Sequence, residues 1–425
     1  MKSIKIEKEI EVAGKYEVIV AGGGVAGVAA AVSAARMGKK VLLIEKTIAL
    51  GGLATIGLVN WFVPSCNGRG TKIVKGLNEE MFNLAIKYGY DCVPEEWRDG
   101  KEPGEGAKTR YVTKFSINIY ILQLTKWLKD ENVDILFDTI VTEPVMENGK
   151  CTALIVENKT GTQCFEADVV IDATGDADVL YRAGVPTVQG KNYHTFCTSV
   201  TDLECCEKAV REKDIQMIYG KGVAGGFANL FGKGHPEGKP FWLGTTAEDV
   251  TNYVVENHLE VLEKIKDDNR KERDITAFPH MAQFRTTRRI DGEYTLTPRD
   301  VYKHFDDSIS AMNDFEHRHF LYEIPYRVMI KKGFKNLIAA GRITSGDGYG
   351  WDLLRVIPPA IITGQAAGVA AAIAIDSNKA VYDIDVSKLQ KILEAQNVMI
   401  HFDDSLVNRE LGPEEDADFE KYDHI

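Results

Sequence analysis

Three glycines and one glutamate near the start of the chain have the types and spacing needed to bind a nucleotide. Gly22, Gly24 and Gly27 form a Gly-x-Gly-x-x-Gly pattern between an apolar run and an alanine-rich run. The first glycine permits a tight turn, the second lets the main chain approach a pyrophosphate, and the third lets a helix pack close to a sheet. Glu45 ends the next apolar run, where a carboxylate can accept hydrogen bonds from ribose hydroxyls. These four residues therefore predict a dinucleotide site.

Four arginines later in the chain are candidates for binding an anionic substrate. Arg285, Arg288 and Arg289 form a dense basic cluster, and Arg355 follows a loop rich in glycine and aromatic residues. Arginine can bind a carboxylate through two parallel hydrogen bonds and can polarise a developing enolate. We therefore interpret Arg288 and Arg355 as candidate catalytic residues. A structural salt bridge is an equal alternative for Arg288, and it is the favoured interpretation for Arg285 and Arg289.

Tyr326, Asp347 and His280 are candidates for moving a proton. Tyr326 can donate a proton or orient a substrate, although packing at an interface is at least as good an interpretation. Asp347 lies on a glycine-rich loop, where it can act as a base, bind ligand hydroxyls or stabilise the loop itself. His280 is the histidine that we consider first as a base. His317 and His319 have no third ligand at a persuasive spacing, so no metal site is expected.

The elements that must position these residues are those of an α/β fold. The segment from Tyr16 to Glu45 has the pattern of a strand, a glycine turn, a helix and a strand. Residues 139–165 alternate in short runs broken by glycine turns, which predicts a β-meander. Residues 167–173 predict a buried strand ending in Ala-Thr-Gly, and residues 358–375 predict a small-residue helix packed close to the first glycine turn. This order predicts a Rossmann-like domain with an inserted β-meander.

The segment between residues 186 and 329 has weaker periodicity and predicts an α+β cap or substrate domain. Two stretches, 247–266 and 308–317, have the amphipathic spacing of helices. A second Gly-x-Gly-x-x-Gly match over 220–225 is followed by further glycines and a proline. It therefore predicts a loop of the cap and not a second dinucleotide site.

Composition argues against several classes of protein. The 425 residues suit two domains, and the net charge of 51 − 63 = −12 argues against a general affinity for nucleic acid or anionic membranes. The first residues contain no apolar core of signal-peptide length, and residues 357–375 fit a buried helix better than a membrane span. The seven cysteines include no Cys-x-x-Cys pair, so we expect reduced thiols and a cytoplasmic protein.

Three separated segments resemble FAD-dependent oxidoreductases with the glutathione-reductase-type FAD fold, close to the fumarate reductase and succinate dehydrogenase flavoprotein architecture. The segments are residues 21–27 with 45–46 and 51–52, residues 172–176, and residues 336–342 with 364–368. A narrower resemblance is to a large bacterial group of these enzymes, most of which has no assigned substrate. It is carried by residues 285–294, 305–308 and 322–327.

The resemblance implies a cofactor role for each matching residue. Those expected near the pyrophosphate, the adenosine or the rest of the nucleotide are Gly22, Gly24, Ala26, Gly27, Glu45, Lys46, Val141, Thr174 and Gly175. Those expected near the flavin end are Gly51 and Gly52 against the isoalloxazine, Gly341 and Arg342 beside the ribityl chain or pyrophosphate, and Gln365 and Ala366 in a helix directed at the ring. A helix start near the flavin would stabilise negative charge on the ring.

The resemblance also implies an FAD-dependent oxidoreductase that transfers a hydride between a small organic substrate and flavin N5. The arginines favour an anionic substrate, and an external electron donor or acceptor would regenerate the flavin. No histidine stands between Gly22 and Arg110, so we expect non-covalent FAD, and Cys66 is expected to be buried. A flavoprotein subunit of a larger electron-transfer complex and a non-redox flavin isomerase are the alternatives. A homo-oligomer is consistent with the size of the chain.

We expect the FAD-binding domain to be discontinuous in sequence. It should comprise residues 14–60, 135–185 and 330–385. Residues 61–134 and 186–329 should form the cap or substrate domain, and residues 386–425 a C-terminal segment.

Overall fold

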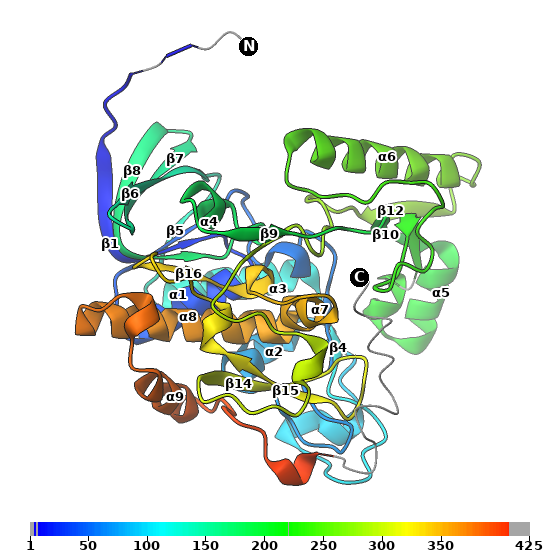
Figure 1. Cartoon of the computed structure of the whole chain (residues 1–425). Helices are drawn as coiled ribbons and strands as arrows, with labels where there is room; N and C mark the ends of the chain where they lie inside the picture. Colours follow the sequence, from blue (N-terminus) through cyan, green and yellow to red (C-terminus); the bar gives the residue numbers. More distant parts are fainter. Residues whose placement is uncertain (1–3, 6, 220, 408–425) are drawn as a thin grey trace.

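A seven-stranded sheet lies at the centre of the computed structural model, which describes residues 4–5, 7–219 and 221–407 (Figure 1). The strand order is β5-β2-β1-β8-β7-β6, and β16 also pairs with β8. Pairing is parallel among the strands β1, β2, β5, β8 and β16. It is antiparallel among β6, β7 and β8. The bounds are β1 Val12–Ala21, β2 Val41–Ile44, β5 Asp134–Leu136, β6 Ile140–Glu147, β7 Lys150–Asn158, β8 Gly161–Asp172 and β16 Leu337–Ala339. The predicted α/β fold with an inserted meander is confirmed.

The long strand β8 joins the meander to the parallel core. Residues 161–166 pair with β7, and residues 170–172 pair with β16. The sequence predicted a meander strand and a separate buried strand here. The chain runs on as one strand because no turn residue stands between Phe165 and Ala167.

Two helices, α1 (Val25–Arg36) and α8 (Ile357–Ser377), pack closely against each other beside this sheet (Figure 1). A Cβ atom added to Gly364 would lie 2.1 Å from the main-chain oxygen of Ala26, and one added to Gly368 would lie 2.4 Å from that of Ala30. These two glycines therefore allow the helix backbones to touch. The predicted small-residue helix close to the first glycine turn is confirmed.

The helix α8 is long and apolar enough to cross a membrane by length and composition alone. Every residue of its most apolar stretch is nevertheless buried inside the protein, as expected for the core helix of a folded domain. The helices α2 (Leu77–Ile86) and α3 (Ile117–Asp130) share a hydrophobic core with α1 and α8.

A second group of elements forms a layer beside the central sheet. The strands β10 (Thr195–Asp202), β11 (Lys221–Phe227) and β12 (Arg273–Ala277) make a three-stranded antiparallel sheet, over which α6 (Ala247–Ile265) lies (Figure 1). The other elements are β3 Trp61–Phe62, β4 Thr113–Lys114, α4 Asp178–Arg182, β9 Thr187–Gln189, α5 Leu203–Glu212, β13 Arg288–Ile290, β14 Ser308–Asn313, β15 Leu321–Pro325, α7 Tyr349–Arg355 and α9 Val386–Ala395.

Two expectations for this region are corrected. Residues 308–313 form the strand β14 and not a helix: all six residues are buried, and five of them pair with β15. Residues 221–227, expected as a loop, form β11. Residue 220 and residues 408–425 of the C-terminal segment lie outside the described part of the chain. The domain boundaries stay a prediction.

Replacing Gly364 by alanine is expected to destabilise the protein, although alanine is the better helix former. The new methyl group would overlap the carbonyl of Ala26, and neither helix can yield without moving away from the other. We expect a loss of roughly 1–3 kcal/mol, measured as a lower thermal unfolding midpoint. Ser377→Ala, at the end of the same helix, is the control. A midpoint for Gly364→Ala at or above that of the unchanged protein would contradict this account.

Candidate active site

A cavity of about 730 Å³ lies where the starts of α1 and α8 approach the ends of the parallel strands. Ligands of open α/β sheets bind at this edge. The lining residues include Gly24, Val25, Ala26, Gly51, Leu53, Ala54, Trp61, Ala173, Gly175, Arg285, Ala340, Gly341, Arg342, Arg355, Val356 and Ile357. Six of the predicted cofactor residues are thus brought together, namely Gly24, Ala26, Gly51, Gly175, Gly341 and Arg342.

The start of α1 is built to accept an anion. Gly24 precedes the helix without a side-chain cap, and the first helical bond runs from Val28 N to Gly24 O. The N–H groups of Val25 and Ala26 therefore have no partner inside the helix, and both residues line the cavity. A Cβ added to Gly24 would meet no protein atom within 4 Å, so this glycine leaves space for a ligand.

Two further glycines bring a second stretch of main chain to the same point. Gly51 has a φ of 97° and donates its N–H to the carbonyl of Gly23 at 2.8 Å. A Cβ added to Gly52 would lie 3.2 Å from the Cα of Gly24. Gly51 lines the cavity, whereas Gly52 supports the turn behind it.

The start of α8 contributes a second helix end to the cavity. The helix begins at Ile357, and Val356 and Ile357 line the cavity. Gln365 and Ala366 lie two turns further on and are fully buried. The Gln365 side chain accepts a hydrogen bond from Leu77 N at 2.9 Å and donates one to Gln396 at 2.8 Å. Gln365 and Ala366 thus belong to a helix that starts at the cavity, as expected, but their own side chains do not line it.

Several other predicted cofactor residues shape the cavity from behind. A Cβ on Gly27 would lie 1.8 Å from the carbonyl oxygen of Gly22, which has a φ of 107°. Both glycines are therefore required by the turn itself. The Glu45 carboxylate accepts hydrogen bonds from Gly23 N at 2.7 Å and from Thr47 N at 2.8 Å. It fixes the glycine turn and keeps acceptor capacity for a ribose.

Three remaining cofactor residues do not line this cavity. Thr174 donates its hydroxyl to Asp172 at 2.7 Å inside the turn, where burial raises the pKa of Asp172 to about 6. The Val141 carbonyl accepts a hydrogen bond from Arg182 at 2.6 Å. Lys46 is exposed. Contacts of Val141, Glu45 and Lys46 with the adenosine stay predictions.

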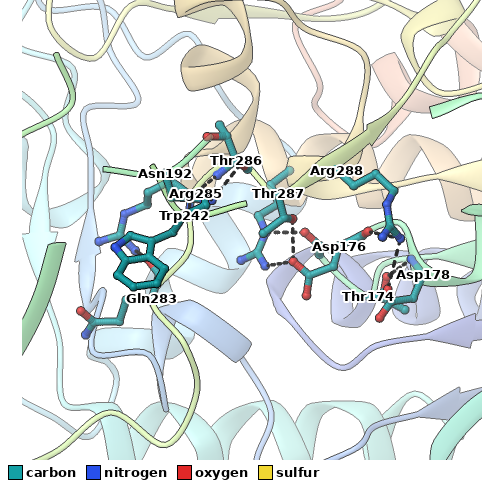
Figure 2. Close-up of polar contacts among 12 residues, drawn as sticks. Thr174, Asp176, Asp178, Asn192, Trp242, Gln283, Arg285, Thr286, Thr287 and Arg288 are labelled. Carbon is teal, nitrogen blue, oxygen red and sulfur yellow. Dashed lines mark hydrogen bonds and ion pairs between the residues drawn. The ribbon is translucent and has the colours of Figure 1, made fainter. Parts of the chain in front are cut away.

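Arg342 is the cation nearest the glycine turn. Its guanidinium donates to the carbonyl of Gly175 and pairs with Asp176 at 2.7 Å, and it lines the cavity. Thr287 also donates to Asp176, at 2.7 Å (Figure 2). The pKa of Asp176 is lowered, because Arg342 and Lys46 outweigh the effect of burial. Arg342 is thus held rigidly beside the place where a pyrophosphate would lie.

A second, polar cavity of about 1520 Å³ adjoins the first. The two cavities share Arg285 and Arg355 in their linings. The other side chains lining the polar cavity include Gln189, Lys191, Asn192, Tyr193, Asn229, Gln283, Asp347, Trp351 and Asp352. An anion bound in the polar cavity would therefore meet both arginines beside the first cavity.

Asn192 holds the segment that carries Arg285. Its side-chain oxygen accepts hydrogen bonds from Arg285 N at 2.6 Å and Thr286 N at 2.8 Å (Figure 2). Burial and the nearby charge of Arg355 lower the pKa of Arg285 to about 10. Within the described residues, Arg285 has no carboxylate partner; its guanidinium donates to the carbonyl of Gln283 at 3.1 Å. It is a partly buried cation that no carboxylate contacts directly among the described residues, although the charge of Asp352 is close enough to attract it.

Asp352 is an acidic group of the polar cavity that the sequence analysis missed. It pairs with Arg355, three residues later on α7. Burial raises the pKa of Asp352, and the pairing with Arg355 opposes this shift. The i, i+3 spacing of an acid and an arginine was visible in the sequence, but nothing there placed the pair beside a cavity.

The structure reverses two predicted catalytic roles. Arg288 turns away from both cavities, approaches Asp178 at 3.5 Å and covers the ring of Tyr181 at 3.9 Å (Figure 2). Arg285, for which a structural role was favoured, occupies the cavity junction instead. Tyr326 is fully buried, and its hydroxyl donates to the carbonyl of Val381 at 2.8 Å, so it cannot reach a substrate in either cavity.

Asp347 and Arg289 form a looser pair at the rim. Asp347 lines the polar cavity, but its side chain is 71% exposed and lies 3.7 Å from Arg289. His280 lines neither of these cavities; its N–H donates to the carbonyl of Ile56 at 2.9 Å. Cys66 is buried as expected, and burial raises the pKa of its thiol.

The chain matches one protein family over most of its length. The family described as FAD dependent oxidoreductase matches residues 17–231 and 245–393. The digeranylgeranylglycerophospholipid reductase of Methanoculleus marisnigri is 29% identical over 184 residues, which is 41% of this chain and 42% of that protein. The chain thus matches less than half of the length of this curated relative.

Similar solved structures include a geranylgeranyl bacteriochlorophyll reductase-like protein from Thermoplasma acidophilum. It has a TM-score of 0.43 and 14% identity, and the match covers 94% of this chain and 95% of that one. A flavocytochrome c3 fumarate reductase has a TM-score of 0.37 and 14% identity over 85% and 78% of the two chains.

The family match covers most of the chain, so the protein belongs to the FAD-dependent oxidoreductase family. It is an FAD-dependent oxidoreductase, and FAD is its cofactor. The cavity fits this cofactor, because Gly24 leaves open space beside uncapped N–H groups and Arg342 supplies a positive charge.

Replacing Gly24 by alanine is expected to weaken FAD binding without unfolding the protein. The residue has ordinary extended dihedral angles, and its new methyl group would meet only the cavity. We expect FAD affinity to fall by about tenfold or more, equivalent to about 1.4 kcal/mol, in fluorescence titrations of the apoprotein. The unfolding midpoint of the apoprotein should not change. Unchanged FAD affinity would contradict the placement of the cofactor at this turn.

Proposed function

We propose that the protein transfers a hydride between a small anionic organic substrate, bound in the polar cavity, and FAD. The observation that carries the proposal is Arg285, a partly buried cation with no carboxylate in direct contact among the described residues, at the junction of the two cavities. Burying an unpaired charge is costly, so such a group is expected to have an anionic ligand.

Arg355 and Asp352 are expected to complete the substrate site. Arg355 lies at the same junction and can share an anionic group of the substrate with Arg285. Asp352 lines the polar cavity, and its raised pKa brings it closer to the range in which a carboxyl group can exchange protons near neutral pH. We assign it as the group that gives or takes the proton accompanying hydride transfer.

The polar lining favours a small substrate over a prenyl lipid. Lys191, Asn192, Tyr193 and Asn229 surround the space next to the arginines. The relative from Methanoculleus is named for reduction of a digeranylgeranyl phospholipid. An isoprenoid chain placed here would displace water from a cavity lined by charged and polar groups, at a cost in free energy.

The redox chemistry itself belongs to the cofactor. FAD, when bound, exchanges a hydride at N5 and passes the electrons to an external partner. The chain provides the cavity that excludes water, the glycine turn that binds the nucleotide and the arginines that orient the substrate. We infer that the FAD is bound non-covalently.

Replacing Arg285 by methionine tests the substrate site. In FAD-loaded protein, titration with small mono- and dicarboxylates is expected to change the flavin absorption spectrum. Loss of a charged hydrogen bond should weaken this binding by about 10- to 100-fold, or roughly 1.5–3 kcal/mol. Arg355→Met should have a similar effect. Loss of the flavin absorbance when candidate alcohols, amines or hydroxy acids are added under anaerobic conditions then identifies the substrate class.

The matched control is Arg211→Met, because Arg211 is an exposed arginine on α5 that pairs with Glu212. This variant should bind the anions as the unchanged protein does. Equal anion affinities in Arg285→Met, Arg355→Met and Arg211→Met would contradict the proposed substrate site.

Anion binding is expected to strengthen as the pH falls through the range in which Asp352 takes up its proton. Asp352 has a raised pKa, so it takes up a proton at a higher pH than an ordinary aspartate. Protonation removes the negative charge beside Arg355 and frees that guanidinium for the ligand. Asp352→Asn should bind anions tightly across this range, with a flatter pH profile. A profile that is identical in the two proteins would contradict this role.

A further inference from the structure

A cluster of two histidines and one glutamate lies away from both cavities. The residues are His304, Glu323 on β15, and His401 in the segment after α9, and their potential ligand atoms lie within 4.8 Å of one another. Glu323 is fully buried, whereas the side chains of His304 and His401 are 42% and 45% exposed. Three segments far apart in the sequence therefore converge on one buried carboxylate.

The ring nitrogens converge on a single oxygen. His304 Nδ1 lies 2.6 Å and His401 Nδ1 lies 3.0 Å from Glu323 Oε1. Two imidazole nitrogens and a carboxylate oxygen are suitable ligands for Zn²⁺ and for similar divalent ions. Bonds of about 2.0–2.2 Å in tetrahedral geometry separate ligand atoms by roughly 3.3 Å, so these atoms would have to move apart by less than about 1 Å.

The groups around the cluster have the arrangement that metal sites use to orient their ligands. The second glutamate oxygen, Oε2, accepts the Phe305 N–H at 2.7 Å, which leaves Oε1 for an ion. The far ring nitrogen of His304, Nε2, lies 3.3 Å from the Asp404 carboxylate. A metal-bound histidine usually donates its other N–H to such a carboxylate. The His304 ring also stacks on Phe402 at 4.3 Å, which fixes its orientation further.

We propose that His304, Glu323 and His401 bind one divalent first-row transition metal ion, with Asp404 orienting His304. The ion would join the segment after α9 to the β14–β15 hairpin. This segment already lies along the hairpin, because Ala311 N donates to Met399 O and Ser308 donates to Ile400 O, both at 2.6 Å (Figure 1). The expectation from the sequence that the chain has no metal site overlooked these residues, which share no local spacing.

Protons compete with a metal ion for the ring nitrogens of His304 and His401. An imidazole must lose its proton to bind a metal, so the affinity should fall as the pH falls. In the alternative case, His304 and His401 are protonated and are held to Glu323 by hydrogen bonds alone. Such a cluster would bind no metal ion.

The test uses the full-length, FAD-loaded protein after dialysis against a chelator. Zn²⁺ is titrated at neutral pH in competition with a chromophoric chelator, and the metal content is measured after gel filtration. We expect one Zn²⁺ per chain and a rise in the thermal unfolding midpoint when Zn²⁺ is added. Binding to His304→Ala and His401→Ala should be at least about 100-fold weaker, and Asp404→Ala should bind one ion about 10- to 100-fold more weakly.

Two controls separate this site from adventitious binding. His258→Ala removes an exposed histidine of α6, and Cys197→Ser removes an exposed thiol, so both variants should bind Zn²⁺ as the unchanged protein does. Circular dichroism and the amount of bound FAD show whether each variant is folded. If His401→Ala does not fold, His401→Gln is the milder substitution to use in its place. Absence of stoichiometric Zn²⁺ in the unchanged protein would overturn the proposal. Equal affinities in the folded histidine variants and the controls would also overturn it.

Discussion

The direct backbone contact between α1 and α8 is the constraint on which the rest of the site depends. Gly364 and Gly368 remove the side chains that would keep the helices apart. A hydrogen bond of 2.8 Å from Ser33 to the carbonyl of Gln365 then fixes the position of one helix along the other. Because of this position, both helices begin at the same cavity, one at an uncapped glycine turn and the other at Ile357. The cofactor site is thus a consequence of how two helices pack.

The same contact positions the arginines. Arg355 ends α7 and is separated from the start of α8 by one residue. The position of that helix start therefore determines where the guanidinium of Arg355 lies. Arg285 reaches the same junction from a distant segment held by Asn192. Arg285 and Arg355 are both partly buried; burial first, and then the repulsion from Arg355, lower the pKa of Arg285. This repulsion, together with the cost of burial, makes the junction a favourable place for an anion.

Features that depend on local sequence could be predicted, whereas the directions of individual side chains could not. The glycine turn, the meander and the small-residue helix were recognisable because turn residues and apolar runs determine them locally. The resemblance to FAD-dependent oxidoreductases implied a cofactor role for Gln365, which lies between Gly364 and Gly368, two turns after the start of the helix at Ile357. Those two glycines contact α1 instead.

The arginine cluster shows the same limit. Arg285 and Arg288 are three residues apart and chemically identical, so the sequence could not decide which one faces the cavity. Strand β13 begins at Arg288 and directs its side chain towards Asp178, while Arg285 lies in the preceding loop held by Asn192. Both roles depend on partners more than 90 residues away in the sequence. Tyr326 was likewise judged from its neighbours, and its buried hydrogen bond to Val381 could not be foreseen.

The most direct test of the account is a crystal structure of the protein with FAD and a small dicarboxylate such as succinate. The account predicts the pyrophosphate at the N–H groups of Val25 and Ala26, and a carboxylate about 2.7–2.9 Å from the guanidinium groups of Arg285 and Arg355. A pyrophosphate bound away from the start of α1, or a dicarboxylate bound away from both arginines, would contradict it.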